Sequence, residues 1–323
     1  MAGMELDLLE IKGPPLSLAV KGWGLSLIFG TVCIAPLHFL PYLKTPLLVI
    51  LTLCTTGLGV LVPLLRDSGQ LSTLFGRLVM AAGTIGEVAP IILISLLLSP
   101  KYNTWQEIGF LLIFLCLFSG VFAIGIGFRP PRLLRFLGKH LRSSTQLPVR
   151  FSLLIIAILG ITAETFGFER IFGAFAAGMI LGQATRGDDG LVLREKIEAI
   201  CFGWFYPFFF VGTGIKFDVP ALTQNIRIIL MIPLFLLLFF IIRGGSVFLY
   251  SHGLERSQKF AFALFVAVPS ISLLVVITQI GLETKMINND IATALISAAL
   301  LAVLLFPTLA QALLSRLDSS PTE

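Results

Sequence analysis

Apolar runs long enough to cross a lipid bilayer recur along this 323-residue chain, with little polar sequence between them. Hydrophobic residues make up 56% of the chain and charged residues only 13%, a balance that a water-exposed globular surface could not carry. A hydrocarbon core about 30 Å thick takes roughly 20 helical residues per crossing. The sequence therefore predicts an all-α polytopic membrane protein whose main solvent is lipid.

Charges, Pro and Gly at the ends of the apolar runs divide the chain into about ten predicted transmembrane helices. They cover residues 15–39, 45–65, 74–99, 105–128, 148–166, 168–184, 197–216, 225–250, 256–281 and 289–314. An even number of crossings places both termini on one side. Most loop Lys and Arg residues lie on that side, above all between Arg129 and Arg150, so we expect both termini to be cytoplasmic in a cell (inner) membrane.

Cysteine and histidine residues are scattered along the chain and form no catalytic or metal-binding pattern. The four cysteines lack the paired spacing of a zinc site or a disulfide framework, and no phosphate-binding glycine loop follows a strand. The basic residues lie in loops, where membrane orientation is their usual role. We therefore expect no enzyme activity, no cofactor and no nucleic-acid partner.

Glu87 is the acidic residue placed deepest in a predicted span, at the middle of residues 74–99. An ionisable side chain inside a span costs at least about 2.5–3.5 kcal/mol, which makes it a candidate functional group. Gly83, Gly86 and Pro90 would let another backbone approach and would loosen the helical hydrogen bonds. We predict an ion- or proton-binding carboxylate; the alternative is a protonated carboxyl bonded to a neighbouring helix.

Arg243 is the candidate charge partner of Glu87. It lies seven residues before the end of the predicted span 225–250, a depth of about 10 Å. One alternative is that its long side chain reaches the membrane surface. Two adjacent glycines, Gly244 and Gly245, instead favour close packing against a partner helix.

Two predicted spans contain residues that interrupt helices. Span 45–65 holds two threonines, two glycines and Pro63 within ten positions, and span 256–281 holds a proline beside two serines near its middle. Interrupted helices at corresponding places in two halves of a chain indicate a transporter site, although a single hydroxyl or proline often only bonds its own helix or kinks it. The predicted crossing-helix site consists of Thr55, Thr56, Pro269 and Ser270.

The order of these features suggests an inverted repeat. Residues 15–99 contain three predicted spans, of which the second is interrupted. Residues 225–315 repeat this order seven spans later. An odd displacement reverses the direction through the membrane, as in transporters built from inverted repeats. We therefore predict a first core repeat at 15–99, linker and interface or dimer-domain helices at 105–216, and a second, inverted core repeat at 225–315.

Several stretches of the chain resemble those of one transporter family. They are Met4–Asp7 (MELD), Thr55–Asp67, Gly173–Gly178 (GAFAAG) and Phe208–Gly214 (FFFVGTG). Together they are similar to the monovalent cation:proton antiporter family, which includes the Kef-type exchangers of the sodium/hydrogen exchanger superfamily. The resemblance runs over nearly the whole chain and implies the antiporter fold with two crossing broken helices. It places Glu87 where the family usually has an ion-binding Asp, and Arg243 at the Lys or Arg of the second repeat.

The chain differs from the usual pattern of this family in two respects. Members usually begin with about three more helices, so this chain is expected to be N-terminally truncated, and a homodimer is expected if those helices are present. Glu87 replaces the usual Asp, and the longer side chain bears on ion choice.

The expected function is secondary active transport that exchanges Na⁺ or K⁺ for protons by alternating access. Glu87 would bind either a proton or the cation, with oxygens from Thr55, Thr56 and Ser270 completing the cation site. One alternative is an organic-anion carrier of related fold, in which Arg243 binds the substrate. The other is a truncated membrane protein that does not transport. Acidic residues near predicted span ends are expected to be structural: Glu164, Glu169, Glu198, Asp218 and Glu283.

Overall fold

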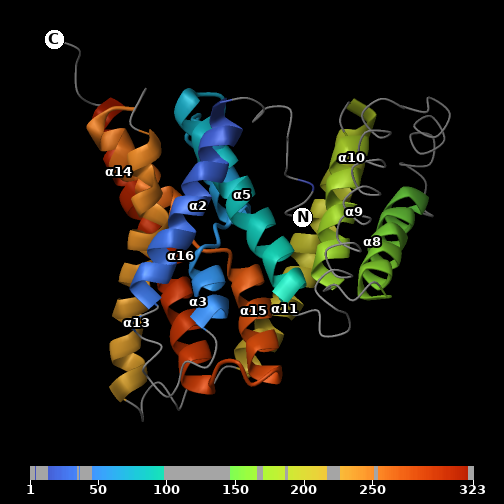
Figure 1. Cartoon of the computed structure of the whole chain (residues 1–323). Coiled ribbons are helices and arrows are strands. Elements are labelled where there is room, and N and C mark those ends of the chain that lie inside the picture. Colours follow the sequence, from blue (N-terminus) through green and yellow to red (C-terminus); the bar gives the residue numbers. More distant parts are fainter. Residues whose placement is uncertain are drawn as a thin grey trace. The chain divides into compact units, whose positions relative to one another are not determined.

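The computed structural model describes residues 4, 14–34, 36, 46–97, 146–165, 170–185, 188–216, 226–250 and 254–318 (Figure 1). Within these ranges every regular element is a helix and no strand occurs. Six described helices are long and apolar enough to cross a membrane, and one bent helix pair would make a seventh span. The all-α polytopic class is confirmed. The count of ten stays a prediction, since span 105–128 lies outside the described residues.

The chain divides into two compact units. Unit 1 comprises Met1–Asp7 and Ile91–Gly214, and unit 2 comprises Leu8–Pro90 and Ile215–Glu323. The assignment of residues 15–99 and 225–315 to two core repeats, and of 105–216 to a linker and interface domain, stays a prediction.

Unit 1 is built around two helices in close contact, α8 (Leu147–Thr165) and α9 (Arg170–Ala184). Gly173 of α9 lies against α8, where an added Cβ would clash with the backbone of Leu159. This close approach explains the glycine that opens the GAFAAG stretch.

Helix α10 (Asp188–Ile200) contacts α8 and continues through a π-helical turn, η2 (Cys201–Phe205), into α11 (Tyr206–Lys216). Helical structure therefore begins nine residues before the predicted span 197–216. The additional turns are amphipathic, because Leu193 and Ile197 lie one turn apart and are both buried. The core of this region consists of Met4, Val149, Leu181, Leu193 and Ile197.

Unit 2 holds the remaining described helices. They are α2 (Pro14–Ile34), α3 (Pro46–Leu53), α4 (Leu58–Asp67), α5 (Leu74–Leu97, as far as Pro90), α13 (Ile226–Phe239), the π-helical turn η3 (Phe240–Gly244), the 3₁₀ segment η4 (Gly245–Tyr250), α14 (Arg256–Val266), α15 (Ile271–Glu283) and α16 (Asn289–Asp318). Helix α16 packs against α13, α14 and α15 (Figure 1). The ring of Phe75 on α5 makes edge contacts with Phe262 and Phe265 of α14.

Both spans predicted to be interrupted are broken. Residues 54–57 separate α3 from α4, and residues 267–270 separate α14 from α15, which are bent by 43° relative to one another. Pro63 lies inside α4 and not at the break. The glycine and threonines next to Cys54 are therefore the residues that leave the helical conformation.

Candidate functional site

The two breaks of unit 2 meet through their backbones. The Gly57 N–H donates to the carbonyl oxygen of Val268 at 2.9 Å, which joins the first break to the second. An added Cβ at Gly57 would lie 2.7 Å from the carbonyl oxygen of Pro269, so only glycine permits this approach. The predicted crossing of two broken helices is therefore present, with Pro269 at the contact.

Helix α5 joins the same crossing because of a proline. In an α-helix the carbonyl of Gly86 would accept a hydrogen bond from residue 90, but Pro90 has no N–H. That carbonyl accepts instead from the backbone N–H of Thr56 in the first break, at 3.1 Å. The carbonyl that Pro90 leaves free therefore forms the hydrogen bond that links α5 to the first broken helix.

Glu87 follows directly after this junction. Its side chain is only 5% exposed, and its Oε1 atom accepts a hydrogen bond from the Ser270 hydroxyl at 3.1 Å. Ser270 occupies the N-cap position of α15, where a serine side chain usually accepts from the helix backbone, yet it makes no such cap bond. The hydroxyl is directed at the carboxylate, and the positive end of the α15 dipole favours a negative charge there.

Arg243 lies in the π-helical turn η3 and is 1% exposed. Its Nε donates to Thr56 Oγ1 at 2.8 Å, and its Nη2 donates to the carbonyl of Ala82 at 2.9 Å. Its Nη1 donates to Ser26 Oγ on α2 at 3.4 Å. The guanidinium is therefore enclosed within unit 2 and joins α2, the first break and α5, rather than extending toward the membrane surface.

The two threonines of the first break differ in their contacts. Thr56 Oγ1 accepts from Arg243 and donates to the carbonyl of Val266 at 2.8 Å. Val266 is the last residue of α14, so its carbonyl has no partner within that helix. Thr55 Oγ1 donates to the carbonyl of Thr52 at 2.8 Å, which is the ordinary contact of a hydroxyl with its own helix.

The predicted site residues thus gather around one stretch of α5. Glu87 contacts Ser270, while Arg243 contacts Thr56 and the carbonyl of Ala82, which precedes Glu87 by five residues. An added Cβ at Gly86 would lie 2.5 Å from Arg243 Nη2, which explains a glycine at that position. The three hydrogen bonds described for Arg243 reach neutral oxygens, and its direct pairing with Glu87 stays a prediction.

Two partners of Arg243 were not predicted from the sequence. Ser26 has no sequence signature, because its hydroxyl also bonds the carbonyl of Gly22 within α2 like many helix serines. The Ala82 acceptor is a main-chain carbonyl, which any residue supplies. The missing N–H of Pro90 frees the carbonyl of Gly86, which bonds Thr56, so it does not point to Ala82.

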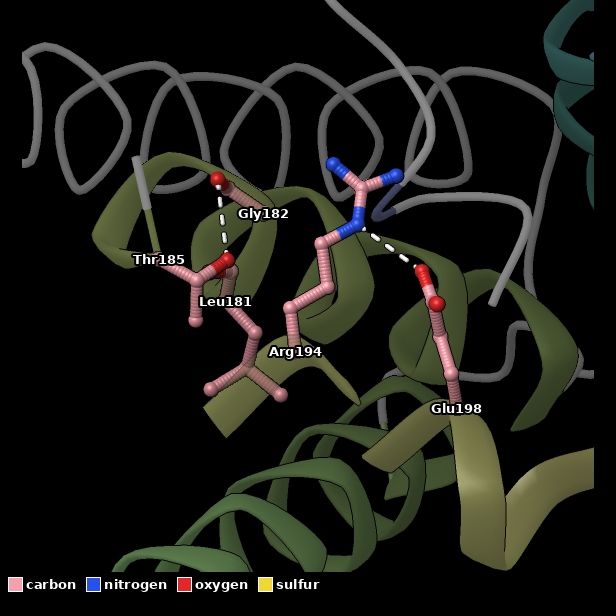
Figure 2. Close-up of polar contacts among 5 residues, drawn as sticks. All are labelled: Leu181, Gly182, Thr185, Arg194 and Glu198. Carbon is pink, nitrogen blue, oxygen red and sulfur yellow. Dashed lines mark hydrogen bonds and ion pairs between the residues drawn. The ribbon is translucent and has the colours of Figure 1, made fainter. Parts of the chain in front are cut away.

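Acidic residues of unit 1 lie in a different environment. Glu198 Oε1 accepts from Arg194 Nε at 2.9 Å on α10 (Figure 2). The Thr185 hydroxyl in the same view donates to the carbonyl of Leu181 in its own helix. Glu164 pairs with Arg170 at 2.8 Å, and both side chains are exposed. Among the residues that the structure describes, no group of three or more His, Cys, Asp or Glu is placed to hold a metal ion.

The sequence of this chain is similar to known membrane transporters over most of its length. Residues 1–316 match the sequence model of a family described as sodium/hydrogen exchanger, transmembrane. A Bacillus subtilis protein named as the Na(+)/H(+) antiporter YjbQ is 25% identical over 282 residues, which are 87% of this chain and 45% of that protein. The Na(+)/H(+)-K(+) antiporter GerN of Bacillus cereus is 25% identical over 95% of this chain and 78% of its own length. The chain thus spans less than half of the Bacillus subtilis relative.

The fold also resembles a solved structure. The sodium proton antiporter of Methanocaldococcus jannaschii matches 99% of this chain and 83% of its own chain, with a TM-score of 0.66 and 18% sequence identity. At this identity the match concerns the fold. It confirms the antiporter fold expected from the crossing of two broken helices.

Proposed function

Because the chain belongs to the sodium/hydrogen exchanger family, we propose that it exchanges a monovalent cation, Na⁺ or K⁺, for protons across a membrane by alternating access. The observation that carries this proposal is the buried carboxylate of Glu87, which contacts Ser270 where two broken helices cross. Both ions stay open, since one relative is named for Na⁺ and another for Na⁺ and K⁺.

Exchange follows from competition for one carboxylate. A buried carboxylate is stable when it is protonated, when it binds a cation, or when fixed dipoles and charges compensate it. Glu87 would take a proton on one side of the membrane and a cation on the other. Oxygens of Ser270, Thr55 and Thr56 are the proposed further cation ligands. The Thr56 hydroxyl already accepts from Arg243 and donates to the carbonyl of Val266. It is therefore less free to coordinate a cation than the hydroxyls of Thr55 and Ser270.

Arg243 is the proposed counter-charge of this cycle. It carries a permanent positive charge within unit 2 and is held by Thr56 and Ala82 beside the stretch of α5 that contains Glu87. When Glu87 releases its cation without yet binding a proton, a nearby positive charge lowers the free energy of the ionised carboxylate. The π-helical turn that contains Arg243 is typical of functional positions in helices.

The organic-anion alternative is less well supported. An anion carrier would need the guanidinium donors of Arg243 for its substrate, but three nitrogens already donate to Thr56, Ala82 and Ser26. The named relatives are cation antiporters. A non-transporting protein is the remaining alternative, and the assay below separates it from an antiporter.

Location and assembly are part of the same proposal. We place the chain in a cell (inner) membrane as a multi-pass protein, with both termini of this chain on the cytoplasmic side because of the basic loops. We also propose a homodimer, provided that the N-terminal helices with which family members usually begin are present.

The test is exchange in proteoliposomes that contain the purified chain. A Na⁺ or K⁺ gradient should drive a change of internal pH for the unmodified chain, and Glu87→Gln should abolish it. Glu283→Gln is the matched control, since Glu283 is exposed at the end of α15 and bonds Gln279. Exchange by Glu87→Gln at the unmodified rate would refute the mechanism, and no exchange by the unmodified chain would support the non-transporting alternative.

A further inference from the structure

A groove of about 580 Å³ lies on unit 2, away from the Glu87 carboxylate. Its volume falls within the roughly 300–1,000 Å³ of ligand pockets. Its lining comes from α2, η3, η4 and α14 and is mainly aromatic and aliphatic: Phe29, Val32, Phe240, Phe248, Phe260 and Ala263. The proposed ion site does not include these residues.

Two glycines form one wall of the groove. An added Cβ at Gly244 would lie 3.1 Å from the carbonyl of Ala263 on α14, and one at Gly245 would lie 2.6 Å from the ring of Phe29 on α2. These glycines let the segment after α13 contact both neighbouring helices with its backbone. The side chains that surround this contact, such as Val32 and Phe248, stay largely exposed and leave the groove open between them.

The groove is charged at one end only. Arg256 and Lys259 line it from the first turn of α14, three residues apart and therefore on the same helix face. Arg256 is exposed and Lys259 is partly exposed. The acidic neighbour, Glu255, caps α14 by accepting from the backbone of Gln258 in a capping box. Its carboxylate is thereby directed at the helix end.

The direction of the groove matches that of a lipid molecule. Arg256 begins the broken span formed by α14 and α15, so it lies at the surface end of the span. Ala263 lies seven residues further along, about 10 Å deeper, within the half-thickness of a hydrocarbon core about 30 Å thick. A cationic end at the surface and an apolar channel running inward are complementary to a phosphate and an acyl chain.

We propose that this groove binds an anionic phospholipid, with its phosphate at Arg256 and Lys259 and one acyl chain along Phe29, Val32 and Ala263. Basic pockets between membrane helices bind anionic head groups, and apolar grooves bind acyl chains through buried area. The binding site is independent of the ion chemistry at Glu87. It would therefore persist in a variant that does not transport.

The test is lipid binding to the full chain in a neutral detergent after removal of co-purified lipid. Native mass spectrometry measures the affinity for phosphatidylglycerol and, separately, for phosphatidylcholine with the same acyl chains. We expect one tightly bound phosphatidylglycerol and much weaker binding of phosphatidylcholine. Arg256→Gln with Lys259→Gln should weaken phosphatidylglycerol binding roughly 30-fold, as expected for two lost charge contacts.

Two further variants separate charge from shape. Ile241→Trp, which fills the groove from a partly exposed lining position, should weaken binding of both lipids. Arg66→Gln with Arg77→Gln is the matched control, since both arginines are exposed on unit 2 outside the groove, and it should bind like the unmodified chain. The thermal unfolding midpoint of each variant confirms that it is folded.

Three results would overturn the proposal. The first is unchanged phosphatidylglycerol binding in the Arg256 and Lys259 variant. The second is equal affinity for the two lipids. The third comes from a photo-crosslinker at position 248 in native membranes, if it captures a polypeptide in place of a lipid.

Discussion

An ion pair of unit 1 and the two buried charges of unit 2 lie in contrasting environments. In unit 1, Arg194 and Glu198 form an ion pair with side chains 28% and 32% exposed (Figure 2). In unit 2, Arg243 and Glu87 are buried, and the contacts described for them are with hydroxyl and carbonyl oxygens. The Arg194–Glu198 pair is partly solvated and its charges satisfy each other, whereas Arg243 is buried and donates to neutral oxygens, and its direct pairing with Glu87 stays a prediction.

The difference indicates which charges suit the proposed transport. A partly exposed pair on one helix contributes only about 0.3–0.5 kcal/mol and is screened by salt. A buried charge held by dipoles has a high free energy unless its surroundings are fixed, and a mobile ion that enters the site changes that free energy strongly. The buried arrangement around Glu87 is therefore the one suited to bind and release an ion.

The largest expected effect concerns Arg243, the largest fully buried side chain described. Arg243→Ala should lower the free energy of unfolding by about 3 kcal/mol, because it leaves a cavity lined by groups that have lost their donors. Arg194→Ala in unit 1 should lower it by less than about 1 kcal/mol. Denaturation in detergent measures both, and equal effects would break the comparison between the units.

Arg243→Met sharpens the same comparison by separating volume from charge. The methionine fills much of the space, so stability should recover most of the loss seen with alanine. Exchange in proteoliposomes should stay impaired, because the counter-charge is gone. Full activity of Arg243→Met would show that the guanidinium is only a packing residue.

Gly86→Ala should have the next largest effect. The added Cβ would approach Arg243 Nη2 to 2.5 Å and Thr56 Oγ1 to 2.7 Å, so the crossing must shift. We expect a loss of about 1–3 kcal/mol in unfolding free energy. Gly59→Ala is the control, since a Cβ there meets nothing within 4 Å; a comparable loss in Gly59→Ala would contradict the role of the close contact.

Ser270→Ala should have a smaller effect, confined to ion binding. Removing the hydroxyl takes away the hydrogen bond to Glu87 and one proposed cation ligand. A loss of about 1.4 kcal/mol in the free energy of cation binding raises the half-saturating cation concentration about tenfold. The maximal rate should change less than the half-saturating concentration. Ser297→Ala is the control, because Ser297 bonds only its own helix in the contacts described; identical kinetics in Ser270→Ala would remove Ser270 from the site.

Much of the site was predicted from the sequence because lipid restricts the choices. A carboxylate and a guanidinium within apolar runs must lie inside protein. Glycines with threonines marked the first break correctly, and a proline with serines marked the second. The partners of Arg243 were harder to predict. Ser26 resembles any helix serine, and the carbonyl of Ala82 belongs to the main chain, so only the folded packing selects them.

Helix boundaries show a similar limit. Residues 188–196 were predicted as a loop because of their charge, but they are helical, since Leu193 with Ile197 buries one face of α10 while Arg194 and Glu198 pair along the helix. The π-helical turn at residues 240–244 was also missed, because an apolar run has the same composition with or without an extra residue in one turn.

The exchange of main-chain hydrogen bonds at the crossing has a mechanical consequence. Thr56 donates to Gly86 of α5 and Gly57 donates to Val268 of the second break, so shifting the first broken helix by a single residue against both neighbours would leave two buried amides without acceptors, at about 1–3 kcal/mol each. That cost favours movement of both broken helices and the first part of α5 as one rigid piece. An ion bound to Glu87 would then move together with these helices and would not be transferred from one broken helix to the other.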